Sequence, residues 1–147
     1  MRVLVIDGQG GQLGSQLIKE IRAAYPGMDV TAVGTNAAAT SAMLKAGAMR
    51  GATGENAVKV NCRRADVIVG PIGIVIADAL LGEVTPEMAV AVGRADAERI
   101  LISLNQCENI VAGVPRLPMS KLIKDAVERL GELEKNGMAG IEKGVCL

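Results

Sequence analysis

A glycine-rich run near the start of the chain is the stretch whose residue types most clearly suggest chemistry. Val3 to Ile6 form an apolar segment typical of a buried strand, Asp7 closes it, and a helical pattern begins at Gln12. Glycine between a strand and a helix permits positive φ angles and lets a phosphate approach the free N–H groups of the helix N-terminus. The sequence therefore predicts a phosphate-binding corner of a doubly wound α/β domain. Its residues are Gly8, Gln9, Gly10, Gly11, Gln12, Leu13 and Gly14.

The spacing of these glycines is G-x-x-G-x-x-G, because position 13, where G-x-G-x-x-G would need a glycine, is a leucine. In this spacing the loop is similar to the N-terminal motif of extended short-chain dehydrogenases and reductases, and the similarity implies an NAD(P)-type cofactor. Those enzymes place an acid at the end of the second strand, whereas this chain has Thr35 and Asn36 there, which could hydrogen-bond a sugar or a 2′-phosphate. They also use a Tyr and a Lys four residues apart, and the only tyrosine, Tyr25, has no such lysine. Hydride transfer by that mechanism is therefore not expected.

Five further titratable residues are candidates for a site. Asp7 could contact a ribose or a metal, but we favour a structural role, because Asp readily accepts backbone N–H bonds. Asp78 interrupts an apolar segment and could face a site, an interface or solvent. Glu55, Arg50 and Lys45 lie near expected loops, and each is also explained as a solvated surface charge.

Composition excludes several classes of function. The chain has no histidine, the commonest general base and zinc ligand, and Cys62, Cys107 and Cys146 match no zinc spacing, so no metal site is predicted. Lys plus Arg equals Asp plus Glu at 16 each and only 1% of residues are aromatic, which argues against nucleic acid and anionic membranes as partners. Free thiols and the lack of a signal peptide predict a cytoplasmic protein.

Expected strands and helices alternate along the 147 residues. After the first strand, strands are expected at 30–33, 48–52, 66–69, 100–104 and 110–114, and helices at 12–24, 37–46, 55–64, 74–81, 86–92 and 119–135. Thr53 and Thr85 are the expected caps of the third and fifth helices. The pattern predicts one domain, residues 1–147: a three-layer α/β/α sandwich with a doubly wound, mainly parallel sheet of five or six strands.

With the usual strand order 3-2-1-4-5, ligands bind at the carboxyl edge of the sheet. This edge would collect Asp7 to Gly11, Thr35-Asn36, Gly70-Pro71-Ile72-Gly73 and Asn105. The stretch from Gly70 to Gly73 could offer N–H groups to a second anion, but a tight turn is the favoured interpretation. Cys107, just beyond Asn105, is better explained as a small buried hydrophobe.

Several strings together resemble a known family over nearly the whole chain. They include residues 6–11 (IDGQGG), 34–37 (GTNA), 39–48 (ATSAMLKAGA), 51–56 (GATGEN) and 69–74 (VGPIGI). The family is small, bacterial, and catalogued only as a domain of unknown function. The resemblance implies a short, stand-alone, Rossmann-like cytoplasmic protein, and it implies no activity, cofactor or catalytic residue.

We therefore expect a protein that binds a nucleotide, dinucleotide or other phosphorylated metabolite, with NAD(P) or another nucleotide as the cofactor. Its predicted binding residues are Gly8 to Gly14, Thr35, Asn36, Gly70, Pro71 and Ile72. The alternative is a structural or regulatory homo-oligomer that binds no nucleotide. A homo-oligomer, in the form of a dimer, is the expected assembly, and the apolar helix from Ile74 to Leu81 could form its face or could equally be internal. A metal enzyme using Asp7 or Glu55 is a weaker third hypothesis.

Overall fold

The computed structural model describes residues 1–104 and 109–137, and within them it contains one parallel five-stranded sheet. The strand order is β3-β2-β1-β4-β5, as expected for a doubly wound fold. The strands are β1 (Arg2–Asp7), β2 (Asp29–Gly34), β3 (Arg50–Thr53), β4 (Val67–Pro71) and β5 (Glu98–Ile102). The predicted α/β/α fold class is confirmed.

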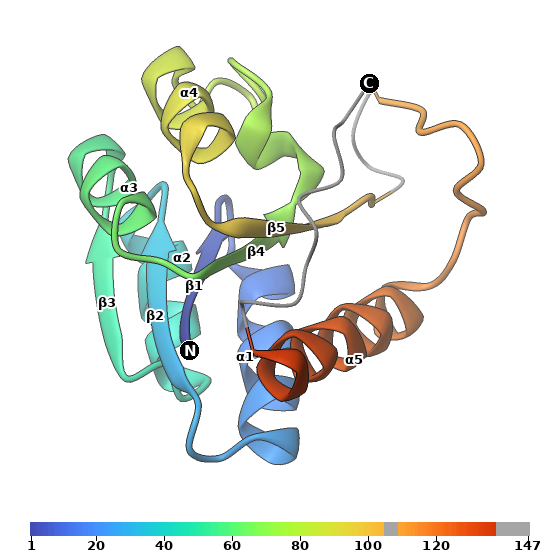
Figure 1. The fold of residues 1–147 in the computed structure, drawn as a ribbon. Helices are drawn as coiled ribbons and strands as arrows, with labels where there is room; N and C mark the ends of the chain where they lie inside the picture. Colours follow the sequence, from blue (N-terminus) through green and yellow to red (C-terminus); the bar gives the residue numbers. More distant parts are fainter. Residues whose placement is uncertain (105–108, 138–147) are drawn as a thin grey trace.

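Helices cover both faces of this sheet (Figure 1). One face packs against α1 (Gln12–Ala24), α2 (Ala37–Lys45) and α5 (Met119–Asn136). The other face packs against α3 (Glu55–Cys62), α4 (Pro86–Arg94) and the short 3₁₀ helix η1 (Ile72–Val75). The connections that leave β1 and β4 thus run to opposite faces, which makes the boundary between these two central strands the topological switch point.

Alternation along β1 explains why both faces must be covered. Val3 and Val5 face the α1 side, Leu4 and Ile6 face the α3 side, and all four side chains are buried. Full burial of each such side chain stabilises the folded state by about 2 kcal/mol. The buried residues of the described chain include no aromatic side chain, so the core consists of aliphatic residues, methionine and cysteine.

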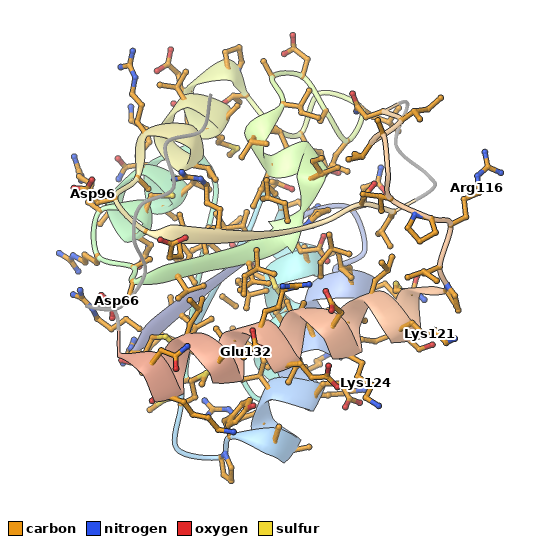
Figure 2. The ribbon with its side chains drawn as sticks, turned by 45° about the vertical axis from the view of Figure 1, so that its right-hand side comes forward. Asp66, Asp96, Arg116, Lys121, Lys124 and Glu132 are labelled. Carbon is orange, nitrogen blue, oxygen red and sulfur yellow. The ribbon has the colours of Figure 1, made fainter. Side chains whose placement is uncertain are left out.

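Helix α5 is amphipathic and closes the α1 side of the sheet. Its buried face consists of Ile123, Ala126, Val127, Leu130 and Gly131. The opposite face is charged, and Figure 2 shows Lys121, Lys124 and Glu132 extending from it. This segregation of apolar and charged residues is what a helix packed on one side of a sheet requires.

The strand register brings every carboxyl end to the same edge of the sheet. Asp7 lies opposite Gly34, Gly34 opposite Thr53, and Pro71 opposite Ile102. The loops that follow β1, β2 and β4 therefore emerge side by side. A ligand crevice is expected where they meet at the switch point.

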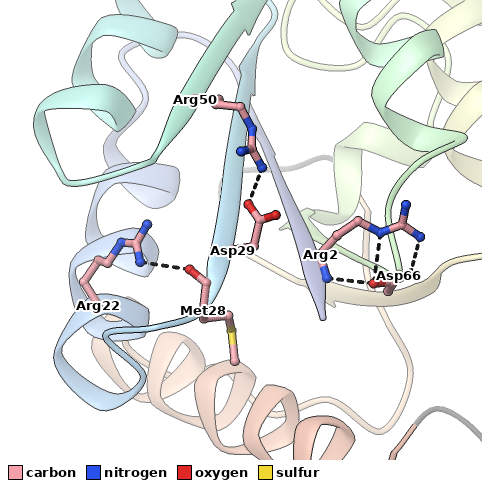
Figure 3. A network of polar contacts seen from close by, with 6 residues as sticks. All are labelled: Arg2, Arg22, Met28, Asp29, Arg50 and Asp66. Carbon is pink, nitrogen blue, oxygen red and sulfur yellow. Dashed lines mark hydrogen bonds and ion pairs between the residues drawn. The ribbon is translucent and has the colours of Figure 1, made fainter.

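Polar contacts secure the opposite, amino edge (Figure 3). The Arg2 guanidinium donates to both carboxylate oxygens of Asp66, at 2.7 and 3.2 Å, and ties the start of β1 to the residue before β4. Arg50 pairs with Asp29, which joins the starts of β3 and β2. Arg50 therefore lies away from the carboxyl-edge loops, and its expected proximity to them was wrong.

The predicted helix at 74–81 is wrong. Its first residues belong to η1, and residues 76–84, hereafter the 76–84 loop, form consecutive turns in which Asp78, Leu80 and Leu81 have φ angles of 64°, 56° and 58°. Ile72, Ile74, Val75 and Ile76 are β-branched, and such runs disfavour a helix. Within this segment Ile74 is buried in the core, whereas Leu81 is 97% exposed.

The predicted strand at 110–114 is also wrong. Residues 109–118 form an irregular connection with a turn closed by the Val114 N–H on the Val111 carbonyl, at 3.2 Å. Gly113 has a φ of 79° and Ile110 is 97% exposed, so the apolar residues here do not enter the sheet. Arg116 extends away from the body of the molecule (Figure 2).

One of the two predicted helix caps is confirmed. The Thr85 hydroxyl accepts the Met88 N–H at 3.1 Å and caps α4. The N-cap of α3 is Gly54, with a φ of 96° and no side-chain hydrogen bond, so the predicted Thr53 cap was wrong. The Thr53 hydroxyl hydrogen-bonds that of Thr40 at 2.7 Å, which ties β3 to α2.

Candidate functional site

A cleft of about 1160 Å³ opens at the carboxyl edge beside the switch point. Its walls are the β1–α1 loop, the start of the β4–α4 connection and the segment that leads into α5. Six of the sequence-predicted residues line it: Gly8, Gln9, Gly10, Gln12, Leu13 and Pro71. The cleft therefore brings the glycine loop of β1 together with the residues that follow β4.

Asp7 shapes the floor of this cleft by organising the loop. Its two carboxylate oxygens accept the Gly8 N–H at 2.8 Å and the Gly14 N–H at 2.7 Å. Burial raises the pKa of Asp7, and the charge of Glu83 adds to this, whereas the N–H groups of Gly14 and Gly8 act in the opposite direction. Asp7 thus has the structural role that its position suggested, holding the turn closed on the first residues of α1.

Glu83 is the second carboxylate at the loop, and sequence reasoning missed it. Its Oε2 accepts the Gln9 N–H at 2.7 Å, the Thr35 hydroxyl at 2.5 Å and the Asn36 side-chain amide at 3.0 Å. Burial opposes ionisation of Glu83, but these three donors outweigh it and hold its pKa below the ordinary value. Glu83 therefore ties the 76–84 loop to both the glycine loop and the end of β2.

Thr35 and Asn36 do not line the cleft, because they lie on the β2 side of the glycine loop with Glu83. Asn36 also caps α2, because its side-chain oxygen accepts the Ala39 N–H at 2.9 Å. In this arrangement both side chains bind the protein itself rather than an open ligand site.

Three amides of the glycine loop remain free of partners. Within residues 1–104 and 109–137, no hydrogen bond uses the N–H groups of Gly10, Gln12 or Leu13. Gln12 and Leu13 are the first two residues of α1, whose N–H groups have no acceptor inside the helix. All three residues line the cleft. Of the amides expected to bind an anion, from Gly8 to Gly14, these three therefore remain available.

The glycines of the loop serve different purposes. A Cβ on Gly11, where φ is 69°, would lie 2.8 Å from the Ala39 Cα, and one on Gly14 would lie 2.6 Å from the Met43 sulfur. These two glycines let α1 and its loop pack closely against α2. A Cβ on Gly10 would meet nothing within 4 Å, which leaves this position open to the cleft.

The remaining wall of the cleft is largely apolar. It includes Leu80, Leu81, Leu104, Leu117 and Met119. Leu80 and Leu81 adopt left-handed backbone conformations that cost about 1 kcal/mol or more each in a non-glycine residue. Such conformations persist only where surrounding contacts fix them, as the hydrogen bonds of Glu83 and the burial of Val84 do here.

The stretch after β4 contributes less than the sequence suggested. Pro71 and Gly73 line the cleft, whereas Gly70 and Ile72 do not. A Cβ on Gly70 would collide with the Ile6 carbonyl oxygen, so this glycine permits close packing of β4 on β1. Asn105, Cys107 and Cys146 lie outside the described residues.

Two of the other titratable candidates, Glu55 and Asp78, form hydrogen bonds within the protein. Glu55 accepts the Thr85 hydroxyl at 2.7 Å and links α3 to α4. Asp78 lines the cleft in a left-handed turn, and its N–H donates to the Val84 carbonyl at 2.8 Å. Among the described residues lining the cleft, Asp7 and Asp78 are the only titratable side chains.

A second, smaller cavity of about 200 Å³ lies at the amino edge of the sheet. Arg2, Arg50 and Arg64 line it, but Arg2 and Arg50 already pair with Asp66 and Asp29. Two of its three positive charges are therefore already paired with carboxylates.

No helix among residues 1–104 and 109–137 has the length and apolar character needed to cross a bilayer. Nor do these residues contain a group of three or more Cys, Asp or Glu side chains that could hold a metal ion.

Fold and cleft together define a doubly wound, Rossmann-like α/β protein with a ligand-sized crevice at its switch point. The chain belongs to the family described as Domain of unknown function (DUF3842), whose model matches residues 2–135. No curated protein matches it.

A similar solved structure is the crystal structure of a dodecameric FMN-dependent UbiX-like decarboxylase from Escherichia coli O157:H7. It shares 16% sequence identity, with a TM-score of 0.44, over 99% of this chain and 97% of that one. Neither the identity nor the TM-score is high enough to transfer a ligand or an assembly to this chain.

Proposed function

We propose that this protein binds a small phosphorylated ligand, such as a nucleotide, in the cleft at the carboxyl edge. The observation that carries the proposal is the set of three unpaired N–H groups, from Gly10, Gln12 and Leu13, that border the cleft. Unpaired N–H groups at the start of a helix are a recurrent anion site, because the helix dipole adds to their partial charges.

The binding mode differs from the one the glycine spacing suggested. Asp7 and Glu83 already accept the N–H groups of Gly8, Gln9 and Gly14, and their negative charges repel an anion. The phosphate is therefore assigned to the N–H groups of Gly10, Gln12 and Leu13, which neither carboxylate accepts. The rest of the ligand would lie against the apolar wall formed by Leu104, Leu117 and their neighbours.

Thermal unfolding in the presence of inorganic phosphate, ribose 5-phosphate, AMP and adenosine tests the proposal. A ligand present at one hundred times its dissociation constant stabilises the folded state by about 2.7 kcal/mol. We expect at least one phosphorylated compound to raise the melting temperature and adenosine to have a smaller effect. The proposal fails if no phosphorylated compound shifts the transition.

Gly10→Asp provides the matching variant. Its side chain enters open space at the cleft, so it should preserve the fold while its charge opposes a bound phosphate. Gly27→Asp is the control, because Gly27 is also exposed with nothing within 4 Å of a Cβ and lies in the α1–β2 turn at the other edge of the sheet. Loss of the ligand-induced shift in both variants alike would contradict the assignment of the site.

The alternative function is a structural or regulatory homo-oligomer in which the glycine corner is only a turn. The internal pairing of the Gly8, Gln9 and Gly14 amides favours it, as does the 97% exposure of Leu81 and Ile110. Light scattering of the wild type and of an Ile110→Asp variant separates the two hypotheses, because Ile110 does not line the cleft. A stable oligomer that Ile110→Asp dissociates, with no response of the wild type to phosphorylated compounds, would support the alternative.

A further inference from the structure

We propose that the 76–84 loop restricts the cleft to ligands with a single nucleoside or comparable apolar body, and excludes dinucleotides through Glu83 and Leu80. This inference rests on the proposed function, since it names the class of ligand that the same cleft would accept. According to this inference, the β2 side of the glycine loop is closed to the body of the ligand and the opposite side is open.

The place where a dinucleotide needs to extend is occupied by the protein. In doubly wound dinucleotide-binding domains, the diphosphate lies on the glycine loop and one ribose is held by an acid at the end of the second strand. Here the end of β2 carries Thr35 and Asn36, and their side chains donate to the Glu83 carboxylate at 2.5 and 3.0 Å. Glu83 thus occupies, from a distant part of the chain, the position that a ribose would take.

Leu80 closes the path between the glycine loop and that position. A Cβ on Gly8 would lie 2.8 Å from both the Leu80 Cδ1 and the Glu83 Oε2, so both side chains rest directly on the glycine loop. Thr35 and Asn36 are consequently absent from the lining of the cleft, whereas Leu80 is part of it. The cleft therefore ends at the 76–84 loop on its β2 side.

The loop is held in this position by its own structure. Asp78 donates its N–H to the Val84 carbonyl at 2.8 Å, and Val84 donates its N–H to the Ala79 carbonyl at 3.1 Å. The Val84 side chain is 1% exposed and belongs to the core on the α3 side of the sheet. These contacts fix the loop, from which Leu80 and Glu83 reach Gly8 and Glu83 also reaches Thr35 and Asn36.

Among the residues that the structure describes, the other side of the cleft is lined mainly by apolar side chains. Leu104, Leu117 and Met119 line it beyond the free amides of Gly10, Gln12 and Leu13. One phosphate on these amides and one base or similar ring against the leucines would use this side alone. A nucleoside monophosphate satisfies this description, whereas a second nucleoside would have to extend across the 76–84 loop.

Binding of AMP and NAD⁺ to the wild-type protein, measured by thermal shift and calorimetry, is the first test. We expect AMP to bind at least about tenfold more tightly than NAD⁺, because the loop opposes only the larger ligand. Equal affinity for AMP and NAD⁺ would overturn the inference and leave the proposed function intact. A failure of inorganic phosphate, AMP and NAD⁺ alike to bind would instead refute the proposed function.

The double variant Leu80→Gly, Glu83→Ala tests the cause of the selectivity. Glycine tolerates the left-handed conformation at position 80, so the loop backbone can persist while both obstructing side chains are removed. We expect NAD⁺ affinity to rise at least about tenfold with little change for AMP. The control is Glu87→Ala, which removes an exposed carboxylate from the first turn of α4. An unchanged preference in the double variant would overturn the role of Leu80 and Glu83.

A readout that needs no ligand checks the geometry. The Gln9 amide, which donates to Glu83 at 2.7 Å, should exchange its proton with solvent more slowly in the wild type than in Glu83→Ala. The Gly10 amide should exchange at the same rate in both proteins. Equal exchange of Gln9 in the two proteins would mean that Glu83 does not hold the loop closed, which would contradict the inference.

Discussion

Adjacent glycines of the β1–α1 loop should respond very differently to alanine. Gly11 has a φ of 69°, and a Cβ there would lie 2.8 Å from the Ala39 Cα and 2.9 Å from the Ala39 carbonyl oxygen. The left-handed conformation costs a non-glycine residue about 1–2 kcal/mol. Forcing a methyl group against backbone atoms of α2 adds about 1–3 kcal/mol. Gly11→Ala should therefore reduce the free energy of unfolding by about 3 kcal/mol.

Gly10→Ala is the matched comparison. A Cβ at position 10 meets nothing within 4 Å, and the residue does not have a positive φ. Alanine at such a position restricts the unfolded chain and changes stability by about 0.4–1 kcal/mol in the favourable direction. Urea unfolding followed by circular dichroism measures both variants under the same conditions. A Gly11→Ala cost below about 1 kcal/mol, or an equal cost at Gly10, would refute this account of the loop.

Three further predictions concern charge, a thiol and the core. Because the folded-state pKa of Glu83 is lowered, Glu83→Gln should reduce the free energy of unfolding at neutral pH. In urea unfolding, the difference in this free energy between the wild type and the variant should shrink as the pH falls through that lowered pKa. A difference that does not change with pH would contradict the prediction. Burial raises the pKa of Cys62 to about 11, so with Cys107 and Cys146 replaced by serine, the thiol should react with Ellman's reagent only on unfolding. Ile18→Ala, at a fully buried position, should cost about 2–5 kcal/mol in the same urea assay, and a cost under about 1 kcal/mol would contradict its place in the core.

Elements specified by local patterns could be predicted from the sequence. The run from Val3 to Ile6 is apolar on both faces, as a central strand of a covered sheet must be, and the apolar stripe of α1 identified its bounds as 12–24. Thr85 before Pro86 marked the start of α4. In each case the residues that form the element also carry the signal for it.

The 76–84 loop could not be predicted, because its conformation depends on contacts far away in the sequence. Leu80 and Leu81 have no local reason to adopt left-handed angles, and an apolar run of this length is equally compatible with a helix. Glu83 reaches Gln9, 74 residues earlier, only because the loop folds back over the carboxyl edge. Its role at the candidate site follows from that tertiary arrangement.

The glycine loop was predicted as a structure but not in its hydrogen bonding. Its position between β1 and α1 follows from the sequence. The division of its amides does not: Gly8, Gln9 and Gly14 are bound by the chain's own carboxylates, and Gly10 is free. Side-chain geometry decides this division, and glycine spacing carries no information about it.

The central claim is that a phosphate binds to the three free amides at the start of α1. Nuclear magnetic resonance of ¹⁵N-labelled protein during titration with AMP tests it most directly. We expect saturable shifts of the Gly10, Gln12 and Leu13 amides in the wild type, and no shift of the Gln12 and Leu13 amides in Gly10→Asp. Unchanged signals for these three amides, or shifts confined to the cavity around Arg2 and Arg64, would contradict it.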